Sequence, residues 1–149
     1  MTAAVGRPRR PEGPSLLFVV GHPVSHSLSP AMHNGVIARL GLPLYYFPVD
    51  LPPGRLGPFL RVVREANFLG GNVTVPHKED AAALADTRSR AVEACGAANT
   101  LVVRGGRLHA ENTDGAGFLD ALAGRGWGRR FPHVVLLGAG GAARVTDSR

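Results

Sequence analysis

The feature that most limits the fold is the apolar run Leu16-Leu17-Phe18-Val19-Val20, which ends at Gly21. A continuous apolar run of this length predicts a β-strand buried on both faces, because a strand with one wet face alternates apolar and polar residues. Strands of this kind occur mainly in parallel sheets that helices cover on both sides. The run therefore predicts an α/β protein.

The remaining chain alternates between strand and helix patterns, which supports a mostly parallel sheet flanked by helices. Further strands are expected at 44–49, 70–75, 99–103, 107–111 and 133–137, and helices at 29–40, 55–66, 77–85, 89–95 and 115–123. Ser29 followed by Pro30 predicts a helix N-cap, and Gly105-Gly106 predicts the turn of a hairpin.

Composition excludes several classes of function. The formal net charge is +6, but the arginines are scattered from Arg7 to Arg149 without interleaved aromatic residues, so no nucleic-acid partner is expected. No apolar run is long enough to cross a bilayer, so no membrane partner is expected either. Cys95 is the only cysteine, which excludes an internal disulfide and favours a reducing, cytoplasmic location.

A glycine-rich segment follows the strand expected at 133–137. Gly138-x-Gly140-x-x-Ala143 is the dinucleotide-binding fingerprint, with alanine in the third position. Its glycines permit a tight turn and the close approach of a pyrophosphate. A purely structural glycine turn is the alternative. The acidic or basic residue that selects the cofactor is expected about twenty residues further on, past Arg149.

Lys78 is the only lysine among seventeen basic residues, and the other sixteen are arginine. A guanidinium stays protonated in proteins, whereas an ammonium can release a proton. Lys78 is therefore a candidate proton donor, although a single lysine can also arise by chance. Asp114 caps the helix expected at 115–123 or faces Lys78. A lysine–carboxylate pair of this kind can exchange a proton with a hydroxyl or a ketone.

Other polar residues lie where strands end. Ser29 is explained by helix capping, but Ser27 is not, and hydroxyls on such loops commonly hold small polar ligands. Asn99 has an ordinary turn role as its alternative. His22, His26 and His33 have no acidic residue near them in the sequence, so no metal site is expected.

Five segments, taken in order, resemble shikimate dehydrogenase. They are Gly-x-Pro-Val-x-His-Ser-x-Ser-Pro (21–30), Asn-Val-Thr-Val-Pro-His-Lys (72–78), Ala-x-Asn-Thr-Leu (97–101), Asn-Thr-Asp-Gly-x-Gly-Phe (112–118) and Gly-Ala-Gly-Gly-Ala-Ala-Arg (138–144). The resemblance covers about residues 15 to 144. Each motif is weak alone, but five in the same order are specific.

The resemblance implies the reduction of 3-dehydroshikimate to shikimate with NADPH, a step in chorismate and aromatic amino acid biosynthesis. By resemblance, Lys78 and Asp114 are the catalytic residues that transfer the proton. The expected substrate-binding residues are Ser27 and Ser29 for the carboxylate, and Thr74, Asn99 and Asp114 for the ring hydroxyls. The residues expected against the NADP pyrophosphate are Gly138, Ala139, Gly140, Gly141 and Ala142.

The resemblance also implies a division of the chain. We expect a disordered leader at 1–14, a substrate-binding domain at 15–113, and at 114–149 a linker helix with the truncated start of a Rossmann-type dinucleotide-binding domain. Family members continue well beyond this point, so a fragment, a frame error or an early stop is expected, and the isolated chain is expected to be inactive. A non-enzymatic fragment that binds shikimate or quinate is the alternative. The preference for NADP over NAD and the oligomeric state stay open.

Overall fold

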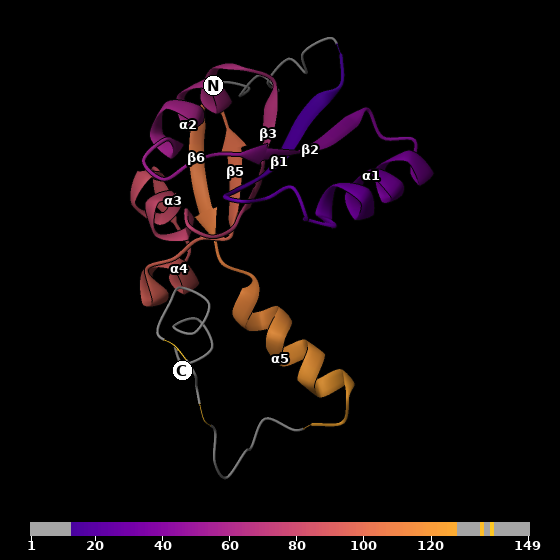
Figure 1. Ribbon diagram of the computed structural model, residues 1–149, viewed down its shortest axis with the longest axis vertical. Helices are drawn as coiled ribbons and strands as arrows, with labels where there is room; N and C mark the ends of the chain where they lie inside the picture. Colours follow the sequence, from indigo (N-terminus) through magenta and orange to yellow (C-terminus); the bar gives the residue numbers. More distant parts are fainter. Residues whose placement is uncertain (1–12, 128–134, 136–137, 139–149) are drawn as a thin grey trace, which may run out of the picture.

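The structure is a computed structural model that describes residues 13–127, Val135 and Gly138. Its centre is a six-stranded sheet with the strand order β2-β1-β3-β5-β6-β4 (Figure 1). The strands are β1 (Ser15–Gly21), β2 (Leu44–Asp50), β3 (Phe68–Val73), β4 (Thr87–Arg88), β5 (Thr100–Arg104) and β6 (Arg107–Glu111). The helices are α1 (Ser29–Arg39), α2 (Leu56–Glu65), α3 (Lys78–Leu84), α4 (Arg90–Cys95) and α5 (Asp114–Gly124).

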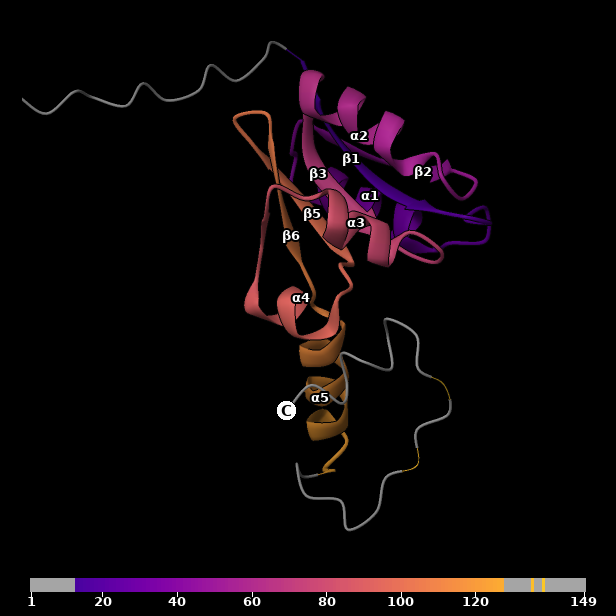
Figure 2. The ribbon, with the colours of Figure 1, turned by 90° about the vertical axis from the view of Figure 1, so that its left-hand side faces the viewer.

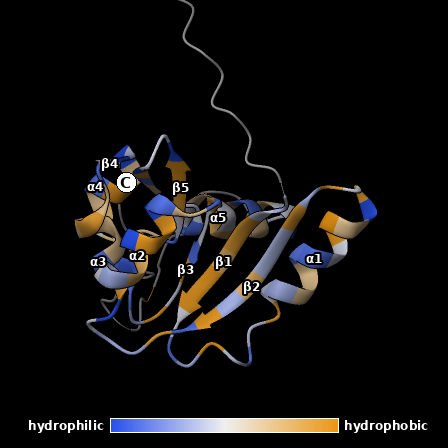
Figure 3. Cartoon of the chain, turned by 90° about the horizontal axis from the view of Figure 1, so that it is seen from above, coloured by the Kyte–Doolittle hydropathy of each residue, from blue (hydrophilic) through white to orange (hydrophobic). Residues whose placement is uncertain are grey.

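The prediction of a buried parallel strand at the start of the chain is confirmed. β1 lies between β2 and β3 and pairs in parallel with both, and Figure 3 shows it as a strongly apolar strand. Phe18 and Val20 are completely buried. The α/β fold class is confirmed, although β5 runs antiparallel to both of its neighbours. That reversal places the start of β5 beside the carboxyl ends of β1 and β3.

Apolar residues on one face of the sheet form the main core. Phe18, Val20 and Val73 pack there against Leu56 and Leu60 of α2, together with alanines of α3. Burial of such aliphatic and aromatic side chains stabilises the fold by about 1.5–3 kcal/mol each. The core therefore fixes the strands whose carboxyl ends carry the polar residues discussed below.

α1 lies beside β2, at one end of the sheet (Figure 3). None of the residues of α1 is fully buried. Asn34 instead binds the backbone of β2: its amide nitrogen donates to Tyr46 O at 2.7 Å, and its amide oxygen accepts from Tyr46 N at 2.9 Å. These two bonds imitate strand pairing, so a side chain of α1 occupies part of an otherwise open edge.

Two helix starts differ from the expectation. α1 begins at Ser29 with Leu28 in the N-cap position, and the Leu28 side chain makes no capping bond, so the prediction of Ser29 as the N-cap is wrong. Ser27, one residue before the N-cap, accepts a hydrogen bond from Ser29 N through its Oγ at 3.3 Å. At α5 the N-cap is Thr113 without a side-chain bond, and Asn112 Oδ1 accepts from Asp114 N at 3.0 Å.

Two strand assignments also differ. β3 begins two residues before the expected position and ends at Val73, because Pro76 forces a turn in which His77 N donates to Thr74 O at 2.9 Å. β4, which pairs in parallel with β6, was not expected, since a strand of two residues leaves no periodic pattern to recognise.

The hairpin prediction is confirmed. β5 and β6 pair antiparallel up to Arg104 and Arg107, and the two residues between them, Gly105 and Gly106, have φ values of +57° and +74°. A two-residue turn with positive φ at both positions matches the twist of the strands and is most accessible to glycine.

Asp86 ties this hairpin to the helices. Its carboxylate accepts a hydrogen bond from Leu108 N at 2.7 Å and pairs with Arg64, which also donates to Leu84 O at 3.2 Å. The Leu108 N–H and, after it, the Arg64 guanidinium lower the pKa of the Asp86 carboxyl. A carboxyl whose pKa is lower in the folded state stabilises the fold at any pH above its pKa in the unfolded chain. This stabilisation is lost as the pH falls through the pKa of the folded state.

We therefore expect Asp86→Ala to lower the melting temperature at pH 7. The difference from the wild type shrinks in acid, below the ordinary pKa of 3.8, because the wild-type carboxyl also becomes protonated there. Thermal unfolding followed by circular dichroism between neutral and acid pH measures both. Asp120→Ala, on the exposed part of α5, is the matched control. An Asp86→Ala deficit that stayed constant down to strongly acid pH would contradict the explanation.

Several expectations fall outside the residues that the structure describes. They are the leader up to residue 12, the strand at 133–137 apart from Val135, and the glycine-rich segment after Gly138. Gly138 itself has a φ of +113°, which glycine adopts easily and other residues rarely do. Within the part of the chain that is described, no helix has the length and hydrophobicity needed to cross a membrane.

Candidate active site

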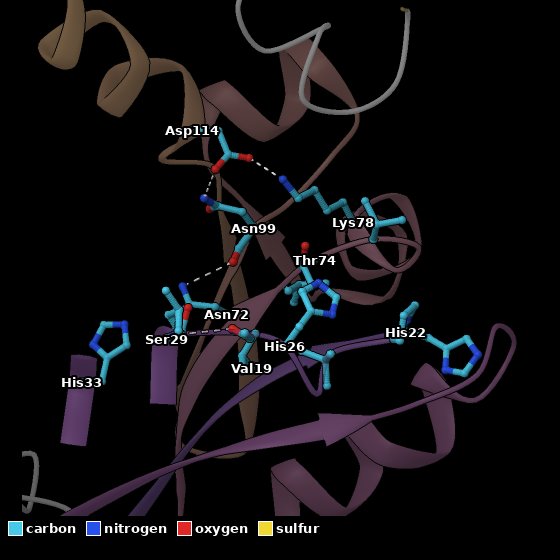
Figure 4. Close-up of a pocket in the computed structure, with 16 residues that line it drawn as sticks. Val19, His22, His26, Ser29, His33, Asn72, Thr74, Lys78, Asn99 and Asp114 are labelled. Atoms are coloured by element: carbon cyan, nitrogen blue, oxygen red, sulfur yellow. Dashed lines mark hydrogen bonds and ion pairs between the residues drawn. The ribbon is translucent and has the colours of Figure 1, made fainter. Parts of the chain in front are cut away.

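Polar residues from distant parts of the chain meet at the carboxyl ends of β1 and β3. They line an open cavity of about 820 Å³, drawn in Figure 4. Parallel strands present their carboxyl ends at one edge of a sheet, which is the usual place for ligands in α/β proteins. Here the antiparallel β5 adds the residue that precedes it, Asn99, to the same edge.

Lys78 and Asp114 form an ion pair in this cavity. The Lys78 Nζ atom lies 2.6 Å from Asp114 Oδ2, and the two side chains are 17% and 33% exposed. Lys78 is the first residue of α3 and Asp114 the first residue of α5, so two helix starts place the pair. The backbone supports it, since Ala98 N donates to Lys78 O at 2.8 Å. The contact expected from the sequence is thus present.

Asn99 holds the second oxygen of the same carboxylate. Its amide nitrogen donates to Asp114 Oδ1 at 2.7 Å and to Thr113 Oγ1 at 2.8 Å. Its amide oxygen accepts from Thr113 N at 3.1 Å and from Thr100 Oγ1 at 2.9 Å. With both ends of the amide engaged, the orientation of Asn99 is fixed, and Asp114 is held on both oxygens (Figure 4).

Hydroxyl groups complete the lining of the cavity. Ser27 lies on the loop between β1 and α1, Ser29 is the first residue of α1, and Thr74 follows β3. Among the described residues, no hydrogen-bond acceptor is recorded for the Ser27 or Thr74 hydroxyl, so both protons are available to a ligand. All the substrate-binding residues expected from the sequence therefore line one cavity.

The three histidines near the cavity do not form a metal site. His22 lies 2.5 Å from Asp50 through its Nδ1 atom, and His33 stacks on Tyr46 with ring centroids 4.4 Å apart. Residues 13–127 contain no cluster of three histidine, cysteine or acidic side chains that could bind a metal ion. Asp50 is an acidic partner that the sequence did not reveal, since it is 28 residues from His22 and reaches it only through the pairing of β1 with β2.

Two polar residues of the site region were missed in the sequence. Asn72 lines the cavity, and its amide oxygen accepts a hydrogen bond from the Tyr46 hydroxyl at 2.8 Å. Asn72 could have been found, because side chains alternate along a strand and Asn72 therefore shares a face with Thr74. Tyr46 carried no such signal, since it comes from β2, and β2 is separated from β3 by β1.

The family model described as the shikimate dehydrogenase substrate binding domain matches residues 19–101, which is more than half of the chain. The chain belongs to this family. The match spans β1 to the start of β5 and so contains Ser27, Ser29, Thr74, Lys78 and Asn99.

Curated relatives and solved structures agree with the family. The shikimate dehydrogenase (NADP(+)) of Methylobacterium radiotolerans is 49% identical over 133 residues, which cover 86% of this chain and 47% of that protein. The shikimate 5-dehydrogenase of Thermus thermophilus in complex with shikimate has a TM-score of 0.81 and 46% identity, covering 88% of this chain and 50% of that one. Its complex with NADP(H) and shikimate has a TM-score of 0.76 and 43% identity, with 88% and 49% covered.

This member of the shikimate dehydrogenase family spans about half the length of the curated relatives that it matches, from 44% to 48% in each case. The matched half contains the cavity and the ion pair. Of the residues expected against a dinucleotide, only Gly138 is described, and Ala139, Gly140, Gly141 and Ala142 lie outside the described part.

Proposed function

We propose that this chain forms the substrate-binding half of an NADPH-dependent shikimate dehydrogenase, which reduces 3-dehydroshikimate to shikimate in chorismate and aromatic amino acid biosynthesis. The observation that carries the proposal is the Lys78–Asp114 ion pair, held by Asn99 and facing hydroxyl groups across one cavity. Relatives named for this activity, and structures solved with shikimate, match the same half of the molecule.

Lys78 is the proposed proton-transfer residue. Reduction of a ketone adds a hydride to the carbonyl carbon and a proton to the carbonyl oxygen, and the Lys78 ammonium supplies that proton. Asp114 orients the ammonium through one oxygen, and Asn99 donates to its other oxygen. In the reverse direction the neutral amine accepts the proton of the hydroxyl. General acid catalysis of this kind contributes about 10²–10⁴-fold to a rate.

The remaining polar residues bind and orient the substrate. Ser27 and Ser29 are the proposed partners of the carboxylate, since both residues line the cavity where the chain enters α1. Thr74, Asn99 and Asp114 are the proposed partners of the ring hydroxyls. Two attachment regions on opposite sides of the cavity fix the orientation of a small ring, and with it the carbonyl group that faces Lys78.

The dinucleotide is proposed to lie beyond α5. Gly138, Ala139, Gly140, Gly141 and Ala142 would hold its pyrophosphate, and the positive φ of Gly138 fits the tight turn that such a segment needs. When bound, NADPH supplies the hydride. NADP is proposed over NAD because the curated relatives and two of the matching structures carry NADP in their names. The cytoplasm is the proposed location, since Cys95 is buried and unbridged, as in a reducing compartment.

A second candidate function is ligand binding without turnover. It is favoured by one observation, which is that Ser27, Thr74 and Asp114 line one cavity formed within residues 19–114. NADPH oxidation in the presence of 3-dehydroshikimate separates the two functions. We expect the 149-residue chain by itself to show no turnover, because a rate depends on a precisely held nicotinamide. Turnover by the purified chain would contradict that expectation.

Binding by the chain itself tests the shared part of both functions. We expect calorimetry to detect shikimate binding, and Ser27→Ala to weaken it by about tenfold, the usual cost of a lost hydrogen bond to a charged group. Ser25→Ala is the matched control, since Ser25 lies on the same loop, is exposed and does not line the cavity. A folded chain without shikimate binding would refute the proposal, and equal effects of the two serine variants would refute the role of Ser27.

A further inference from the structure

A continuous series of hydrogen bonds leads from the Lys78–Asp114 pair to Tyr46 on β2. Asp114 Oδ1 accepts from Asn99, and Asn99 Oδ1 accepts from Thr100 Oγ1. Thr100 Oγ1 in turn accepts from Asn72 Nδ2 at 3.2 Å, and Asn72 Oδ1 accepts from the Tyr46 hydroxyl at 2.8 Å. We name this series the Tyr46 chain. We propose that Tyr46 is a positioning residue, whose hydroxyl holds Asn72 in place and, through Asn72 and Thr100, supports the groups that hold the proton-transfer pair.

The direction of the Tyr46 chain follows from its acidic end. An ionised carboxylate only accepts hydrogen bonds, so Asn99 must turn its NH₂ group toward Asp114. The Asn99 amide oxygen then faces Thr100. The Thr100 hydroxyl has one proton, which it must donate to that oxygen. The orientation of each group thus determines whether the next group must donate or accept. If an amide were flipped, two donors or two acceptors would face each other.

The same reasoning reaches Tyr46 from the other side of Thr100. Because the Thr100 proton is engaged, its oxygen has only acceptor capacity left, and Asn72 must present its NH₂ group. The Asn72 amide oxygen is then left for a donor, which is the Tyr46 hydroxyl. Tyr46 therefore supplies the donor that this Asn72 oxygen needs. Without that hydroxyl the Asn72 oxygen loses its donor, and the side chain loses one of the bonds that hold it in place.

The surroundings of Tyr46 keep it in this role. Its side chain is 2% exposed, and His33 stacks on its ring. Burial raises the pKa of Tyr46 to about 12, and a hydrogen bond with the Ser29 side chain opposes part of the rise. The phenol therefore keeps its proton over the whole neutral range and remains a donor to Asn72. Its backbone is held as well, through the two bonds with Asn34.

The position of Tyr46 links the two ends of the proposed substrate site. On one side its hydroxyl contacts Ser29, a proposed partner of the substrate carboxylate. On the other side it begins the series that ends at Asp114 and Lys78. The inferred role of Tyr46 rests on the proposed function, because it concerns the positioning of a proton-transfer pair. The hydrogen bonds themselves are present without a ligand. Tyr46 therefore connects the two ends of the proposed substrate site through hydrogen bonds.

The test compares Tyr46→Phe with Tyr45→Phe in the 149-residue chain. The two residues are neighbours on β2, but Tyr45 is 56% exposed and its ring stacks on Phe47. Lys78 is the only lysine, so isotope-labelled lysine gives a single side-chain nuclear magnetic resonance signal from the site. We expect Tyr46→Phe to shift this signal and the Asn99 side-chain amide signals, and to weaken shikimate binding about tenfold. We expect Tyr45→Phe to change none of them.

A second variant, Thr100→Val, breaks the Tyr46 chain in its middle while keeping the shape of the side chain. It is expected to shift the Lys78 signal in the same direction, which covers the case in which Tyr46→Phe does not fold. Unchanged Lys78 and Asn99 signals in a folded Tyr46→Phe or Thr100→Val variant overturn the inference. If the wild type does not bind shikimate, the proposed function fails. The ligand-free signals then still decide whether Tyr46 positions the pair.

Discussion

Replacing Lys78 with methionine should lower kcat for 3-dehydroshikimate by about 10²–10⁴-fold, the usual contribution of a positioned general acid. Methionine has a similar length but no proton to give. The assay needs a cofactor-binding half, which a hybrid can supply by taking the residues after Trp127 from the Methylobacterium radiotolerans relative. Shikimate binding should change much less than kcat, since Ser27, Ser29 and Thr74 remain in the cavity.

Lys78→Arg separates charge from proton transfer in the same hybrid. Arginine keeps a cation beside Asp114, but a guanidinium does not release its proton at neutral pH. We therefore expect Lys78→Arg to be nearly as slow as Lys78→Met while it binds the substrate better. If Lys78→Arg kept kcat within tenfold of the wild-type hybrid, Lys78 would act through its charge, and the assignment of the proton donor would be wrong.

Gly70→Ala should have the largest effect on stability. Gly70 lies in β3 with a φ of +143°, and a Cβ atom there would lie 2.1 Å from Leu101 O on β5. Both the backbone conformation and the space therefore exclude a side chain. We expect a loss of about 3 kcal/mol or more in the free energy of unfolding. Urea unfolding followed by circular dichroism measures this loss.

Gly35→Ala on α1 is the control for this substitution. Gly35 is exposed in the helix, and no atom lies within 4 Å of the position that its Cβ would take. Alanine is favoured over glycine inside helices by about 1 kcal/mol, so this variant is expected to be as stable as the wild type or slightly more stable. A Gly70→Ala variant that unfolded at the same urea concentration as Gly35→Ala would show that β3 and β5 can separate without cost.

Short-range patterns predicted much of this molecule. β1, the hairpin around Gly105-Gly106 and the limits of most helices follow from apolar runs, glycines and prolines that act within a few residues. The contact between Lys78 and Asp114 was also accessible, because a lone lysine after one strand and an acidic residue before a helix suggested a pair. In each case the signal lies in the same short segments of the sequence that form the feature.

The features that were missed depend on which strands become neighbours. The Tyr46 chain needs β2, β3 and β5 in their observed positions, and no local pattern in the sequence defines the order of strands in the sheet. The same holds for His22 and Asp50, which meet only through the pairing of β1 with β2. The prediction of Ser29 as the N-cap failed for a different reason, since the helix begins one residue earlier than expected, with Leu28 as the N-cap, and leucine gives no capping signal in the sequence.

Asp114 also begins α5, the helix that leaves the sheet and extends away from it in Figure 2. At 1.5 Å per residue, its eleven residues make a rod of about 16 Å. Because both oxygens of the Asp114 carboxylate are bound, by Asn99 and by Lys78, the rod cannot pivot without stretching one of those bonds. The proposed proton-transfer pair therefore also anchors α5, and a change in the tilt of α5 would move the carboxylate that orients Lys78.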